Sequence, residues 1–183
     1  MIDKIKGSLH QVAASGDAST VFALLDQGQS VNALDASGLT ALHRAVWNGH
    51  VEAAQALIQR GADINAKRVM AEMGNAWTPL HFAAENNRPE CARLLLEAGA
   101  DPDPKDEFGQ TPLFIAAGQE NNHEAMRAEL VAPDVARLLI EYGASVYGTN
   151  AHHDWTGIDP DAGISARLQE LELVHQRTLK MVW

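Results

Sequence analysis

A motif that returns at a nearly constant interval is the strongest constraint on how this chain can fold. The stretches "SLHQVAASGD", "TALHRAVWNGH", "TPLHFAAENNR" and "TPLFIAAGQEN" share one apolar pattern. Their leading leucines, Leu9, Leu42, Leu80 and Leu113, are 33, 38 and 33 residues apart. A second motif, as in "LIQRGADIN", follows each of them and carries a glycine at 28, 61, 99 or 143. Such a period predicts stacked units that bury their apolar faces only against one another.

Helix-start and helix-end residues recur at the same places in each unit. Thr40, Thr78 and Thr111 precede apolar helical patterns and are predicted to cap the helices that follow. Pro79 and Pro112 then fall at the first helical position, where no backbone donor is needed. The recurring glycines follow a second apolar run and suit a left-handed turn. Each unit is therefore predicted to be a helix, a turn, a second helix and an outward hairpin.

These motifs resemble ankyrin repeats, whose unit of about 33 residues opens with T-P-L-H-x-A. The resemblance implies an all-α solenoid with short β-hairpin loops. We expect one domain at 1–183, with units at about 8–33, 34–66, 67–103 and 104–148 and a divergent C-terminal cap at 149–183. The resemblance also implies that His10, His43 and His81 hydrogen-bond the backbone near a helix start rather than catalyse a reaction. His50, between two helices, is interpreted in the same way.

The chain departs from its own period in two insertions. Five extra residues fall between Asn65 and Leu80, in a hairpin at 66–77 that carries Met70 and Met73. This hairpin would either present adaptable apolar side chains to a partner or fold back on itself. Eleven extra residues fall at 118–134, between the paired helices of the fourth unit, as a second contact site or a locally packed excursion. The tail at 149–183 has the one apolar stripe that a terminal capping helix needs.

The tryptophans point to a protein-binding surface. In ankyrin repeats, hairpin tips and variable positions of the first helix form the binding face, and buried tryptophans anchor many interfaces. One expected surface position precedes each capping threonine, at Leu39, Trp77, Gln110 and Trp155. The alternative is that these rings fold onto neighbouring hairpins. The candidate partner-binding residues are Trp47, Asn48, Met70, Met73, Trp77, Glu85, Asn86, Glu107, Phe108 and Trp155.

Charge and cysteine content narrow the partners. The formal net charge is −10, which argues against nucleic acid as a ligand and favours a partner protein with a basic patch. We expect Asp35, Asp106 and Asp154 to join the glutamates in an acidic rim around the rings. Cys91 is the one cysteine, so an intramolecular disulfide is impossible, and we expect it to pack rather than react. With no signal-like or membrane-spanning stretch, the chain is expected to be cytoplasmic, away from membranes and monomeric when free.

The sequence therefore predicts a non-catalytic protein-binding module that needs no cofactor or metal. A sharper hypothesis is a stoichiometric inhibitor, or immunity-type protein, of a basic enzyme or toxin. The alternative is a generic adaptor or assembly scaffold. A rival from another class is a metal-dependent enzyme that uses His152, His153 and Asp154. Adjacent side chains converge poorly on one metal ion, so this rival is the weaker prediction.

Overall fold

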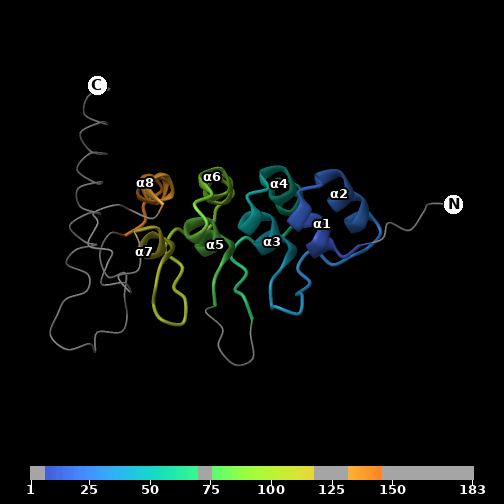
Figure 1. The fold of residues 1–183 in the computed structure, drawn as a ribbon, viewed down its shortest axis with the longest axis horizontal. Coiled ribbons are helices and arrows are strands. Elements are labelled where there is room, and N and C mark those ends of the chain that lie inside the picture. Colours follow the sequence, from blue (N-terminus) through green and yellow to red (C-terminus); the bar gives the residue numbers. More distant parts are fainter. Residues whose placement is uncertain (1–6, 70–75, 118–131, 146–183) are drawn as a thin grey trace, which may run out of the picture.

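The chain forms a row of helix pairs from whose lower edge the connecting loops project (Figure 1). The computed structural model describes residues 7–69, 76–117 and 132–145. Odd-numbered helices form one row next to the loops, and even-numbered helices form a second row above it, on the side away from the loops (Figure 1). The helices in these residues are α1 (Leu9–Ser15), α2 (Ala18–Asp26), α3 (Ala41–Asn48), α4 (Val51–Gln59), α5 (Pro79–Glu85), α6 (Pro89–Glu97), α7 (Pro112–Ala117) and α8 (Pro133–Glu141). This arrangement confirms the predicted all-α repeat solenoid.

The expected β-hairpins are loops without strands in the part of the chain that the structure describes. A backbone hydrogen bond joins the two ends of each loop: Asp35 N to Leu39 O at 2.9 Å, Arg68 N to Trp77 O at 2.9 Å, and Asp106 N to Gln110 O at 3.1 Å. Arg68 thus takes the position that aspartate has in the other two loops. The five-residue insertion therefore lies between Arg68 and Trp77, and its residues 70–75 lie outside the described residues.

The helix starts are built as the sequence predicts. The backbone N–H of Thr40 donates to Nδ1 of His43 at 3.1 Å, and that of Thr78 donates to Nδ1 of His81 at the same distance. Nδ1 accepts in both pairs, so the imidazole proton sits on Nε2. Pro79 begins α5 at the position where a missing donor does no harm.

The far nitrogen of the same histidines ties each unit to the next. Nε2 of His43 lies 3.1 Å from the carbonyl oxygen of Trp77, and Nε2 of His81 lies 3.1 Å from that of Gln110. Both histidines are fully buried. Their predicted structural role is therefore confirmed, and the same side chain fixes a helix start and the loop of the following unit.

Further polar bonds hold the units in register. Side-chain oxygens of Asn32, Asn65 and Asp103 accept from backbone amides of the next loop at 2.9–3.1 Å. Nε2 of His50 lies 3.0 Å from the carbonyl oxygen of Ala14, which confirms the structural role expected for His50. Its ring also rests on Gly16, where a Cβ atom would lie only 2.6 Å from Nδ1.

The core of the described residues consists mostly of leucines and alanines, with a few valines and larger side chains and, as expected, Cys91. Burial raises the pKa of the Cys91 thiol to about 11, so the thiol stays protonated and inert. Each even-numbered helix, which we call an outer helix, is followed by a glycine in the left-handed conformation, as predicted. The φ angles are 89° at Gly28, 81° at Gly61, 93° at Gly99 and 86° at Gly143. The second insertion lies between α7 and α8, but its residues 118–131 and the predicted cap at 149–183 lie outside the described residues.

The buried histidines should make folding pH-dependent. Burial lowers the pKa of His43 and of His81 from 6.5 to about 4, so the folded chain holds both rings neutral where the unfolded chain protonates them. The contribution of the two neutral rings to the free energy of unfolding is therefore fully present above pH 6.5 and is lost as the pH falls toward 4. At pH 5 each histidine should lower the free energy of unfolding by about 2 kcal/mol relative to pH 7.5. Urea unfolding followed by circular dichroism measures this difference.

A folded His81→Gln variant is the control for that measurement, since glutamine does not titrate. It should lose roughly half of the difference. An unchanged difference in the variant would show that His81 does not cause it.

Candidate functional site

Three aromatic rings from the second and third units form a cluster beside the loops. The rings of Trp47 and Phe82 are stacked, with centroids 5.2 Å apart and planes 20° apart. Trp77 meets Phe82 edge to face, also at 5.2 Å. Phe82 is only 3% exposed and Trp77 is half-buried, whereas Trp47 is 40% exposed. The cluster therefore presents one large apolar side chain, Trp47, whose position is fixed by the rings behind it.

Trp77 does not take the open surface position that the sequence suggested. Its indole Nε1 donates to Oδ2 of Asp106 at 3.1 Å, and its ring stacks on His81. Leu39, at the equivalent position, is fully buried. The expectation that the residue before the capping threonine lies at the surface is therefore wrong at Leu39, and Trp77 is half-buried. The carbonyl oxygen of Trp77 binds His43 of the preceding unit, and its ring packs against His81 and Phe82, whereas Leu39 belongs to the core.

Asp35 and Asp106 do not form the expected acidic rim, because both turn into their own loops. Oδ1 of Asp106 accepts from the amides of Phe108 and Gln110, each at 2.8 Å, and Asp106 is 7% exposed. Oδ1 of Asp35 likewise accepts from the amides of Ser37 and Leu39. These carboxylates hold the loops closed and are not available to a partner. Asp154 lies outside the described residues.

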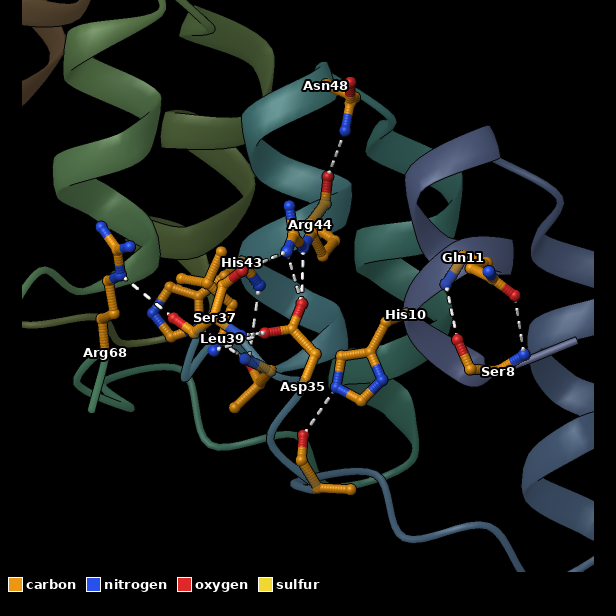
Figure 2. A network of polar contacts seen from close by, with 12 residues as sticks. Ser8, His10, Gln11, Asp35, Ser37, Leu39, His43, Arg44, Asn48 and Arg68 are labelled. Carbon is orange, nitrogen blue, oxygen red and sulfur yellow. Dashed lines mark hydrogen bonds and ion pairs between the residues drawn. The ribbon is translucent and has the colours of Figure 1, made fainter. Parts of the chain in front are cut away.

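Asp35 also holds Arg44, a residue that the sequence analysis did not single out (Figure 2). Oδ2 of Asp35 lies 2.7 Å from Nε and 2.6 Å from Nη2 of Arg44. Burial is the largest influence on the pKa of Asp35 and raises it, but the bonds from Leu39, Arg44 and Ser37 outweigh burial and keep the pKa below its usual value. The Arg44 guanidinium lies over the Trp47 ring, 5.8 Å from its centroid. Comparing units would have revealed Arg44, because Phe82 has the same position one unit later.

The remaining described candidates lie on α3, on α5 or in the loops next to these helices (Figure 1). We call the exposed side chains of α3, α5 and the loops at 33–39, 66–69 and 104–110 the inner face. Glu85, Glu107 and Phe108 are exposed, the last by 56%. Asn48 and Asn86 each donate to a carbonyl four residues earlier at 2.9 Å and so also close their helix ends. Lys67 and Lys105 are exposed in the loops. The inner face therefore carries both signs of charge around Trp47.

The other sequence-predicted sites cannot be placed on this surface. Met70, Met73 and Trp155 lie outside the described residues, as do His152, His153 and Asp154 of the metal hypothesis. Within the described ranges, no group of three or more histidine, cysteine or acidic side chains could hold a metal ion. None of the helices described is long and apolar enough to cross a membrane.

Comparison with known proteins agrees with this architecture. The family model for ankyrin repeats in three copies matches residues 4–68 and 67–150. The chain therefore belongs to the ankyrin repeat family, a class of protein–protein interaction modules.

Similar curated proteins come from several organisms. Human protein phosphatase 1 regulatory subunit 27 is 41% identical over 134 residues, which are 72% of this chain and 55% of that protein. The ARF GTPase-activating protein Git of Drosophila melanogaster is 38% identical over 72 residues, 39% of this chain and 10% of that protein. An ankyrin repeat-containing protein of Schizosaccharomyces pombe is 42% identical over 55 residues, 30% of this chain and 27% of that protein. The chain thus matches about half or less of the length of these relatives.

Asp106 should be a stability determinant of the inner face. Asp106→Ala removes the acceptor of two backbone amides and of the Trp77 indole, and should lower the free energy of unfolding by about 2 kcal/mol or more. Asp106→Asn keeps an oxygen for the amides and should cost less. Glu107→Ala, at the exposed neighbouring residue, should change stability by no more than about 0.5 kcal/mol. Urea unfolding of the three variants tests this order, and equal losses in all three would contradict it.

Proposed function

We propose that this chain binds a partner protein through its inner face, as a non-catalytic module whose central anchor is Trp47. The exposure of Trp47 supports this most directly. A tryptophan that is 40% exposed, yet stacked on Phe82 and covered in part by Arg44, is already ordered before a partner arrives. Ordered aromatic side chains lose little entropy on binding and are common hot spots.

The charged side chains of the inner face indicate the charge that a partner's surface should carry. Glu85 lies at the end of α5, one turn beyond Phe82, and therefore on the same side of that helix as the aromatic stack. Glu85 and Glu107 are the exposed carboxylates of the inner face that remain for a basic patch, once Asp35 and Asp106 are bound within their loops. The net charge of −10 adds a long-range attraction to a basic partner, which speeds association.

Regulation of an enzyme is the more specific form of this proposal. One relative is named as a regulatory subunit of protein phosphatase 1, and it matches 72% of this chain. By analogy, the chain would bind an enzyme or toxin with a basic surface and inhibit it stoichiometrically, in the cytoplasm and as a monomer when free. The second candidate is an adaptor that brings proteins together. It is favoured by relatives such as Git, in which the matched region is 10% of a longer protein.

Two pairs of variants test the inner face as the binding site. Trp47→Ala should weaken capture of the partner by about 30-fold, or on the order of 2 kcal/mol. Tyr142→Ala is its control, because Tyr142 is 38% exposed but follows the outer helix α8. Glu85→Lys should also weaken capture, whereas Glu97→Lys should not, although both glutamates are exposed final residues of their helices. Affinity capture from the source cell, followed by mass spectrometry and titration of the captured protein, measures both pairs.

Equal capture by all four variants would place the binding site elsewhere on the chain. The inhibitor form makes a further demand: the activity of the captured protein should fall to zero at one equivalent of this chain. Full activity in a saturated one-to-one complex would exclude inhibition and leave the adaptor function.

A further inference from the structure

The junction between the first two units is hollow where the next junction is filled. Trp47 lies five residues after Leu42, and Ala14 lies five residues after Leu9, so these two residues occupy equivalent positions. Their neighbours across the junction are equivalent as well: Phe82 faces Trp47, and Arg44 takes the position of Phe82 one unit earlier. An indole stacked on a phenyl ring in one junction is thus replaced by a methyl group and a guanidinium in the other.

A groove of about 350 Å³ lies at this junction. Ala14 and Ala36 contribute small side chains to its lining, Ser8, Gln11 and Ser37 contribute polar ones, and Arg44 lines it beside Asp35. The attachment of the loop is similar in all three units. His10 binds the carbonyl oxygen of Ala33 at 2.8 Å, and the equivalent residues Ala66 and Pro104 bond to His43 and His81, which also bind the residue before the next capping threonine. The missing indole therefore accounts for the open space.

The orientation of Arg44 decides what chemistry the groove can take. Asp35 contacts Nε and Nη2, which form one edge of the guanidinium, and Ser37 accepts from Nη2 at 3.2 Å. A carboxylate or phosphate could therefore not bind that edge of the guanidinium, and the negative charge of Asp35 would repel it. A cation would meet Arg44 itself. The guanidinium lies over Trp47, and Arg44 also lines the groove, so the part of its plane that a ligand in the groove can contact remains. Planes of this kind stack on aromatic rings.

We propose that this groove accepts an aromatic side chain of the partner, a tryptophan or tyrosine, which stacks on Arg44 and takes the place that Trp47 has one unit later. Oγ of Ser37 accepts from Arg44 and Oε1 of Gln11 accepts from the Ser8 amide, and each oxygen has a second lone pair for the N–H or O–H that such a ring carries. The inference rests on the proposed binding through the inner face and adds a second aromatic position, contributed by the partner, beside Trp47.

Indole is the probe for the groove, and the whole chain can be titrated with it without any partner. Indole should shift the backbone amide resonances of Ala14, Ala36 and Ser37 in a saturable way, with a Kd on the order of 1 mM for so small a ligand. Benzoate and butylammonium, which carry charge, should shift these resonances much less. Absence of saturable shifts, shifts confined to residues around Glu85, or stronger binding of benzoate would each overturn the proposal.

Filling the groove from within is the matched mutational test. Ala14→Trp places the indole of the second unit in the first and should abolish indole binding. Ser15→Trp, at the exposed neighbouring residue outside the groove, should leave it unchanged. Arg44→Lys keeps the charge but removes the plane, and should weaken indole binding roughly tenfold. Circular dichroism confirms that each variant is folded, and unchanged indole binding by folded Ala14→Trp would refute the site.

The titration and the capture experiment separate this inference from the proposed function. If Trp47→Ala loses the captured partner but indole does not bind the groove, only the groove proposal fails. If indole binds the groove but inner-face variants capture the partner as well as the unchanged chain does, the proposed function fails.

Discussion

The two-ended hydrogen bonding of His43 and His81 is the interaction on which the rest of the described structure depends. Nδ1 accepts from the capping threonine and sets the start of an inner helix, while Nε2 binds the loop of the next unit. One rigid ring therefore positions a loop relative to the helix before it. This works only with a neutral imidazole, because a protonated ring could not accept from the threonine amide. Burial supplies that condition by lowering the pKa of both rings to about 4.

The bond between His43 and the next loop also determines which ring of the aromatic cluster is exposed. Because His43 holds the carbonyl of Trp77, the loop lies close to α3, and the Trp77 side chain packs against Phe82 and binds Asp106. Trp47 stacks on Phe82 and, among the described residues, packs against no other ring, so it stays 40% exposed. The exposed anchor is thus a consequence of how the loop is attached.

The sequence predicts those features that depend on neighbours along the chain. Capping threonines, a proline at a helix start and left-handed glycines act within one turn, so their roles follow from local spacing. The direction of the Trp77 side chain depends on its bond to Asp106, 29 residues away, and spacing alone could not reveal it. The place of the five-residue insertion follows from the backbone hydrogen bond between Arg68 and Trp77, and no sequence pattern within the loop predicts this bond. Arg44 was recoverable, by comparing each unit with the next rather than with the family motif.

The positions whose residues differ between units distinguish the surface of this chain from that of a uniform repeat stack. The side chains of His43, Asp106 and Asn32 are committed to backbone bonds within or between units, so changing them would disturb the fold before it altered recognition. Ala14, Trp47 and Glu85 share one position, and Gln11, Arg44 and Phe82 share another. Gln11 also accepts from the amide of Ser8 in a capping box, whereas Arg44 and Phe82 contact other side chains. Along α1, α3 and α5 these two positions produce a groove, then a pair of stacked aromatic rings, then an acidic surface. A partner that fits this order must match three adjacent junctions at once, and that requirement supplies selectivity which no single repeat could provide.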